Sequence, residues 1–100
     1  MNIYDTSKDN PFSVEEYDVA EDIGIGLVAK VILYDDDIHT FDEVITQLIK
    51  ATACSRSQAE AKTLEVHTKG KSMVYEGELP ECLRVSHILE EIALHTQIEM

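Results

Sequence analysis

From residue 27 onward, apolar and polar positions follow patterns that each suit one element of secondary structure. Residues 27–35 are a Leu-, Val- and Ile-rich run that ends in aspartates, which predicts a mostly buried strand. Residues 71–77 alternate between apolar and polar side chains and predict a second strand. The run 96–100 at the end of the sequence predicts a short third strand.

A first helix is predicted between residues 40 and 53. Thr40 and Glu43 have the spacing of a capping box, in which the threonine oxygen accepts a free backbone N–H and the glutamate reaches back. Behind them, apolar residues recur at the spacings of one helical stripe: Phe41, Val44, Ile45, Leu48 and Ile49.

Two further helices complete the pattern. A second capping box, Ser55 with Gln58, begins a helix that runs to about residue 68 with Gly70 as its C-terminal cap. Pro80 suits the first turn of the last helix, whose apolar face is expected to contain Leu79, Cys82, Leu83, Ile88, Leu89 and Ile92. The predicted fold is an α+β sandwich of order β-α-α-β-α-β, with three helices on one face of a short, three-stranded antiparallel sheet.

Charge divides the 100 residues into two parts. Residues 1–26 hold seven acids and one lysine and have no sustained apolar period, so we expect an acidic, mostly disordered N-terminal extension. Residues 27–100 are expected to form a single small domain.

The composition excludes several classes of function. A net charge of −12 argues against binding to nucleic acid or to an anionic membrane surface and favours cationic partners. No apolar run approaches the roughly 18 residues of a membrane-spanning helix, and the N-terminus lacks the pattern of a secretory signal. The two cysteines, Cys54 and Cys82, lie far apart, which fits reduced thiols in a cytoplasmic protein.

Three consecutive aspartates, Asp35, Asp36 and Asp37, stand where the first strand ends. They could hold magnesium for phosphoryl transfer, but no glycine-rich phosphate loop or neighbouring base accompanies them. They could cap the following helix, but capping would account for only one or two of them. They could also bind a ligand with a cationic and an apolar end, together with two histidines and two valines of the adjoining segments: His39, His67, Val44 and Val66.

The stretch VILYDDDIHTFDEV (31–44), followed about 20 residues later by VHTKGK (66–71), resembles the ClpS family, adaptors of the ATP-dependent Clp protease. The family pattern is a strand that ends in Asn-Asp-Asp, a short turn, and a helix with a gate residue and a valine. A Val-His-x-x-Gly-Lys follows at the end of the second helix. The resemblance covers about residues 28–100.

This resemblance implies a non-enzymatic adaptor, without metal or cofactor, that is monomeric when free. It would bind the free N-terminus of a protein whose first residue is bulky and apolar, and deliver that protein to an AAA+ unfoldase of the ClpA or ClpC type. Two alternatives remain: a module that binds only the unfoldase and modulates it, and a magnesium-dependent phosphoryl-transfer enzyme that uses Asp35 and Asp37.

By position, the resemblance assigns binding of the α-amino group to Asp35, Asp37 and His67, and expects Asp36 to point away from the ligand. It assigns the apolar pocket to Tyr34, His39, Phe41, Val44, Thr63 and Val66, with Phe41 as the gate. His39 stands where the family has threonine, and Thr63 where it has an apolar residue, so both are expected to make the pocket wall more polar. Glu81 and Arg84 are assigned to the unfoldase contact, and the acidic extension to delivery.

Overall fold

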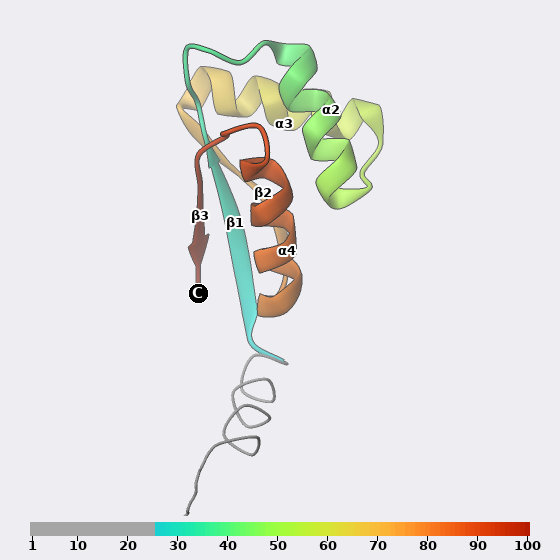
Figure 1. The fold of residues 1–100 in the computed structure, drawn as a ribbon, viewed down its shortest axis with the longest axis vertical. Helices are drawn as coiled ribbons and strands as arrows, with labels where there is room; N and C mark the ends of the chain where they lie inside the picture. The colour runs from blue at the N-terminus through green and yellow to red at the C-terminus, as the bar shows by residue number, and fades with distance from the viewer. Residues whose placement is uncertain (1–25) are drawn as a thin grey trace, which may run out of the picture.

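The strand that precedes the three aspartates lies at the centre of the sheet. A computed structural model describes residues 26–100, so all but the last residue of the predicted acidic extension (1–26) lies outside the described residues. Strand β1 (Val28–Tyr34) pairs antiparallel with β2 (Lys71–Glu78) on one side and with the shorter β3 (Thr96–Glu99) on the other (Figure 1). The register places Tyr34 opposite Lys71 and Leu33 opposite Thr96.

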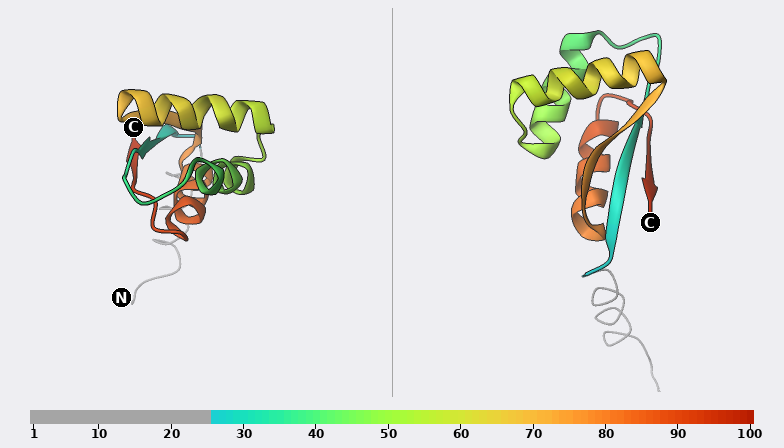
Figure 2. Two further views of the ribbon diagram at one scale, coloured as in Figure 1. Left: turned by 90° about the horizontal axis from the view of Figure 1, so that it is seen from above. Right: turned by 180° about the vertical axis from the view of Figure 1, so that it is seen from behind.

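Three helices connect and cover these strands: α2 (Phe41–Thr52), α3 (Arg56–Lys69) and α4 (Leu79–Glu90). Helix α4 runs alongside β1, while α2 and α3 pack together near the end of the sheet where β1 terminates (Figure 2). The predicted fold class and element order are confirmed. None of the helices that the structure describes is long and apolar enough to cross a membrane.

Both predicted capping boxes are present. Thr40 Oγ1 accepts from the Glu43 N–H at 3.1 Å, and a Glu43 carboxylate oxygen accepts from the Thr40 N–H at 2.8 Å. Ser55 and Gln58 make the same reciprocal pair at the start of α3. At the other end of α3, Gly70 adopts a φ of 88°, which a residue without a Cβ reaches without strain.

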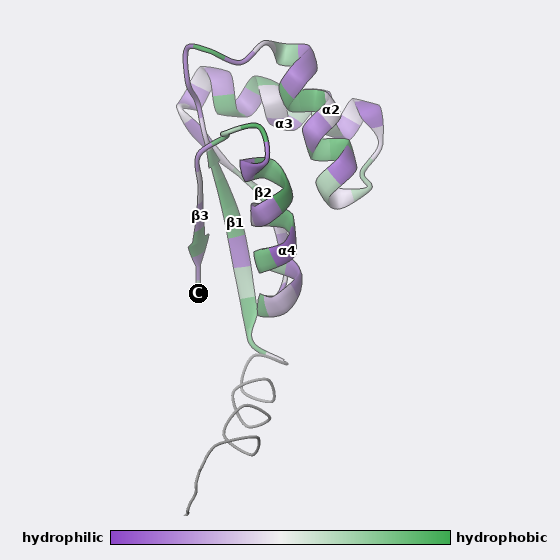
Figure 3. Cartoon of the chain, viewed as in Figure 1, coloured by the Kyte–Doolittle hydropathy of each residue, from purple (hydrophilic) through white to green (hydrophobic). Residues whose placement is uncertain are grey.

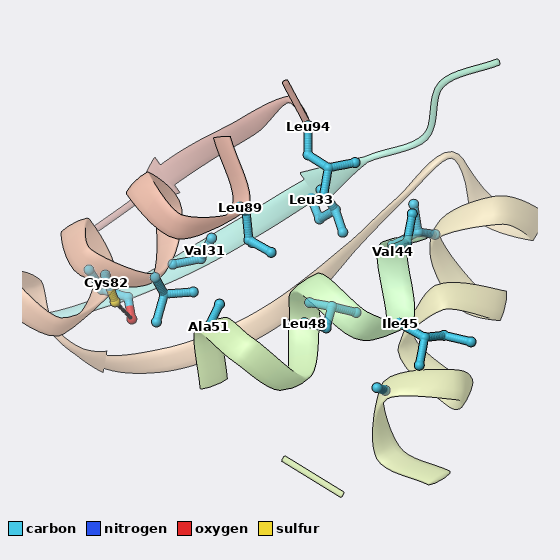
Figure 4. Close-up of a cluster of buried hydrophobic side chains, with 13 residues drawn as sticks. Val31, Leu33, Val44, Ile45, Leu48, Ala51, Cys82, Leu89 and Leu94 are labelled. Atoms are coloured by element: carbon cyan, nitrogen blue, oxygen red, sulfur yellow. Dashed lines mark hydrogen bonds between the residues drawn. The ribbon is translucent and has the colours of Figure 1, made fainter. Parts of the chain in front are cut away.

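The core lies between β1 and the helices. Hydropathy colouring shows apolar residues along β1 and on parts of each helix (Figure 3). Alternate residues of β1, Ala29, Val31 and Leu33, are at most 1% exposed, as the two-residue period of a strand requires. Figure 4 shows Val31 and Leu33 among buried side chains of α2 and α4. The thiol of Cys82 is buried there and donates to the Ala29 carbonyl at 3.3 Å.

One residue of the predicted apolar face of α4 is placed wrongly. Leu83 is 54% exposed, whereas Val85, which was not predicted, is fully buried. The buried positions Cys82, Val85, Ser86 and Leu89 follow spacings of three, one and three, so Leu83 falls on the outer side of the helix. The apolar identity of Leu83 does not change the phase of the helix.

Candidate functional site

The end of β1 is held by two backbone hydrogen bonds from different parts of the chain. The Tyr34 N–H donates to the His95 carbonyl at 3.0 Å, in the segment that precedes β3. The Asp35 N–H donates to the carbonyl of Gly70, the C-terminal cap of α3, at 2.9 Å. These bonds fix the start of the aspartate triplet beside the last turn of α3, which carries His67.

A pocket of about 360 Å³ opens at this junction. It is lined by all nine residues that the sequence assigned to the N-terminal residue of a ligand: Tyr34, Asp35, Asp37, His39, Phe41, Val44, Thr63, Val66 and His67. The pocket is completed by Leu33, Asp36, Thr40 and Leu94. The structure therefore brings the predicted residues together, while their roles toward a ligand remain predictions.

The mouth of the pocket is acidic. The Asp35 carboxylate lies 3.8 Å from His67 Nδ1, and these side chains are 35% and 60% exposed. No residue in the described part of the chain donates a hydrogen bond to the Asp37 carboxylate. Carboxylates accept several hydrogen bonds each, so the mouth can receive a group with several N–H donors.

The floor of the pocket is apolar. Leu33, Val44, Val66 and Leu94 are all buried and belong to the hydrophobic core. In Figure 4, Leu33 and Leu94 lie together, between Leu89 and Val44. Sequence reasoning missed both leucines: Leu33 could have been found as the last inward residue of β1, but Leu94 lies in an irregular segment without a periodic signal.

Phe41, at the predicted gate position, packs against His67. Their ring centroids are 5.3 Å apart and the rings are inclined at 72°, an edge-to-face arrangement. Phe41 remains 43% exposed at the start of α2. The gate residue is therefore in contact with a residue assigned to the amine.

Asp36 uses its carboxylate within its own loop. Its Oδ1 accepts from the N–H groups of Ile38 and His39 at 3.0 and 2.9 Å, and its Oδ2 lies 2.7 Å from His39 Nδ1. Burial disfavours the charged form, but these hydrogen bonds outweigh it and lower the pKa of Asp36. Asp36 thus serves the loop, although it also lines the pocket, and its expected direction away from the ligand remains a prediction.

His39 is bound at both ring nitrogens. Its Nε2 lies 2.5 Å from the Ile92 carbonyl, and its Nδ1 contacts Asp36, so the side chain is only 9% exposed. Both partners are acceptors, and a ring that donates to both must carry two protons. The Ile92 carbonyl and then the Asp36 carboxylate raise the pKa of His39 against the effect of burial. His39 lines the pocket, but both of its polar atoms are already occupied.

Two other lining residues also direct their hydroxyl groups to the protein. Thr63 Oγ1 donates to the Ala59 carbonyl one turn earlier in α3, at 2.7 Å, so its single O–H is already used, while its contribution to the polarity of the wall remains a prediction. The Tyr34 hydroxyl donates to Gln97 Oε1 at 2.6 Å, and its ring packs edge-on against His95. Both hydroxyl groups therefore already donate to acceptors within the protein.

The residues assigned to the unfoldase lie on α4, outside this pocket. Arg84 Nε donates to Glu81 Oε1 at 3.0 Å, and Arg84 Nη1 donates to the Ala51 carbonyl at 3.1 Å. About half of each of these two side chains is exposed. Within residues 26–100, no cluster of three His, Cys, Asp or Glu side chains has the geometry of a metal site.

Comparison with known proteins shows a family and a similar fold. The model of the family described as ATP-dependent Clp protease adaptor protein ClpS matches residues 28–98. The fold is similar to that of Agrobacterium tumefaciens ClpS2 bound to L-phenylalaninamide, with a TM-score of 0.68 and 18% sequence identity. This similarity covers 72% of the present chain and 94% of the other. No curated protein sequence matches the chain.

Proposed function

Because the chain belongs to the ClpS family of Clp protease adaptors, we propose that its pocket binds the free N-terminus of a protein whose first residue is bulky and apolar. The bound protein is then delivered to a Clp AAA+ unfoldase for degradation. The observation that carries this proposal is the meeting of an acidic mouth (Asp35, Asp37 and His67) with an apolar floor in one pocket of about 360 Å³.

The mouth suits an α-ammonium group. An α-amino group has a pKa of about 7.7–8.0, so near neutral pH it is mostly a cation with three N–H donors. Asp35, Asp37 and a neutral His67 nitrogen offer three acceptors at the pocket entrance. Each hydrogen bond that involves a charged group contributes about 1.5–3 kcal/mol.

The floor suits the side chain of the first residue. Complete burial of a Leu or Phe side chain contributes roughly 1.5–3 kcal/mol, and lost translational and rotational freedom opposes binding by at least about 4 kcal/mol. Under these magnitudes the apolar side chain alone does not offset the lost freedom, and the hydrogen bonds of the amine must supply the difference. Moderate affinity follows, to which both the free amine and the apolar side chain contribute.

The relative of similar fold supports this assignment. L-phenylalaninamide, to which A. tumefaciens ClpS2 is bound, combines a free α-amino group with a benzyl side chain. These are the two chemical features that the acidic mouth and apolar floor of the present pocket would satisfy.

Delivery requires a second surface, for which we propose Glu81 and Arg84 on α4 as contacts to a ClpA- or ClpC-type unfoldase. The acidic residues 1–26 would assist delivery. In this role the protein acts as a monomeric, cytoplasmic adaptor without catalytic activity of its own.

Isothermal titration calorimetry tests the proposed binding. We expect peptides that begin with free Phe or Leu to bind, and acetylated copies, as well as peptides that begin with Met or Glu, to bind much more weakly. Failure of every peptide would contradict binding of N-terminal residues and favour the alternative of a module that modulates the unfoldase alone.

A further inference from the structure

We propose, resting on the function proposed above, that His39 in its imidazolium form is a positioning residue. It ties two walls of the pocket together and thereby sets the affinity for the N-terminal residue. One wall is the loop 35–40, which carries the acids of the mouth, and the other is the segment 92–95, which supplies Leu94 to the floor.

The bond between these walls spans 53 positions of sequence. His39 Nε2 lies 2.5 Å from the Ile92 carbonyl, two residues before Leu94. Between them, Ala93 adopts a φ of 66°, a left-handed conformation that L residues rarely adopt without support. Two main-chain bonds also hold this segment, from Tyr34 to the His95 carbonyl and from Ala93 to the Glu90 carbonyl. The bond from His39 is the one that reaches it from the loop that carries the acids.

The connection depends on two protons. Asp36 and the Ile92 carbonyl both accept, so a neutral ring can donate to only one of them and turns a lone pair toward the other. A threonine, which the ClpS-like pattern has at this position, carries a single O–H and cannot donate to both. The substitution by histidine therefore introduces a connection that responds to protonation.

The surrounding charges favour the imidazolium. Asp36 contacts it from its own loop, and Glu43 of α2 adds a favourable electrostatic interaction. From the segment after α4, the contact is the Ile92 carbonyl, while nearby Glu91 is bound to Lys50. On the α3 side, His67 is paired with Asp35.

Calorimetric titration of one peptide that begins with Phe, from about pH 6 to about pH 9, tests this role. The amine of the free peptide titrates in the same way in every experiment. The ratio of wild-type to variant affinity therefore reports only the pH dependence that arises from the protein. We expect His39→Ala to bind about tenfold more weakly at the acidic end, since a charge-assisted connection is lost, and to approach the wild type at the alkaline end. Equal affinity and an equal pH profile would overturn the proposal.

Asp36→Asn is the matched variant. An asparagine Oδ1 can still accept from the N–H groups of Ile38 and His39, while its Nδ2 can donate to Nδ1 of a neutral His39. The neutral ring then still donates to the Ile92 carbonyl. We expect this variant to bind more tightly than the wild type at the alkaline end, an effect that general destabilisation would not produce. Loss of binding in parallel with His39→Ala at all pH values would contradict it.

Nuclear magnetic resonance without peptide separates this inference from the proposed function. We expect the ring nitrogens of His39 to be doubly protonated at about pH 6.5, and the Leu94 methyl signals to shift with the titration of His39. If no peptide binds but these shifts occur, the proposed function fails and the connection between the walls stands. A neutral His39 at that pH would contradict the proposed connection between the walls. Leu94 methyl signals that do not change as His39 titrates would also contradict it.

Discussion

Neighbouring aspartates have different tasks because their hydrogen bonds differ. The Asp36 carboxylate accepts hydrogen bonds from Ile38 and His39, whereas no described residue donates to the Asp37 carboxylate. A row of like charges is therefore divided between Asp36, which maintains the loop, and Asp37, which we propose receives a ligand. Asp35 has an intermediate position, since it is close to His67 but partly exposed.

Replacement of Asp37 by alanine should weaken binding of a Phe-initiated peptide about tenfold or more, because one charge-assisted hydrogen bond is lost. The melting temperature should remain nearly unchanged, because Asp37 is exposed. His67→Ala should act in the same direction. Calorimetry and thermal unfolding measure the two effects, with Glu99→Ala as a control that removes an exposed acid outside the pocket. Equal weakening in the control would mean that only net charge matters.

The pair formed by His39 and Asp36 predicts how stability changes with pH. The pKa of His39 is raised above 6.5, so its contribution is complete below pH 6.5 and is lost as pH rises through the folded-state value. The pKa of Asp36 is lowered below 3.8, so its contribution is complete above that value and is lost as pH falls through the folded-state value.

Between these limits, we expect the contribution of this pair to the free energy of unfolding to be greatest, with a decline of about 1–2 kcal/mol on the alkaline side. Urea denaturation at a series of pH values measures it. His39→Ala should remove the alkaline decline, and an unchanged decline in this variant would assign it to another group.

At the level of single residues, the sequence predicted which side chains line the pocket but not what occupies their polar atoms. The ClpS-like motif placed Thr63 and His39 in the wall. The bond from Thr63 to Ala59 closes within one helical turn, and that from His39 to Ile92 spans the domain. Neither follows from residue type, since a hydroxyl or imidazole has several possible partners.

At the level of elements, the start of α3 matters because this helix carries Thr63, Val66 and His67 into the pocket. Ser55→Ala should lower the free energy of unfolding by about 1 kcal/mol, since the cap at the helix N-terminus is lost. Peptide affinity should stay within about twofold when measured well below the unfolding transition, because Ser55 lies outside the pocket.

Ser57→Ala, two residues later in the exposed first turn, is the control. It removes a hydroxyl 3.3 Å from Ser55 Oγ but leaves the capping bond from the Gln58 N–H to Ser55, so it should change stability little. A loss of peptide affinity in Ser55→Ala in the folded protein would show that the cap positions the pocket and does not simply stabilise the helix.

Elements were predictable where their signals are local. The two capping boxes, Gly70 and Pro80 lie within a turn of the ends that they mark, and they were recovered. Leu83 was misplaced because composition alone does not fix the phase of a helix, and Leu94 was missed because its burial depends on the path of the chain after α4.

At the scale of the whole molecule, the pocket and the N-terminal end of α4 occupy opposite ends of β1. Leu79, the first residue of α4, donates its N–H to the Leu27 carbonyl just before β1. The aspartates follow Tyr34, the last residue of β1. Ligand binding and unfoldase contact, as proposed, therefore use surfaces that do not compete. Figure 1 shows α4 running along the length of the strand.

Deletion of residues 1–24, which lie outside the described residues, should leave peptide affinity intact and impair delivery, because the residues assigned to the ligand all lie between positions 34 and 67. Calorimetry measures the first effect, and degradation of a Phe-initiated substrate by the unfoldase and protease measures the second. A truncated protein that no longer binds peptide would refute this division of labour.

The two hydrogen bonds that hold the end of β1 join main chain to main chain, from Tyr34 to His95 and from Asp35 to Gly70. Side-chain substitution does not remove such bonds, apart from replacement by proline at a donor. The main chain therefore fixes where these residues lie, whatever side chains they carry. The side chains at positions 35 and 39 can therefore differ while the site keeps its place. A frame of this kind allows ligand preference to drift over evolutionary time without a new fold.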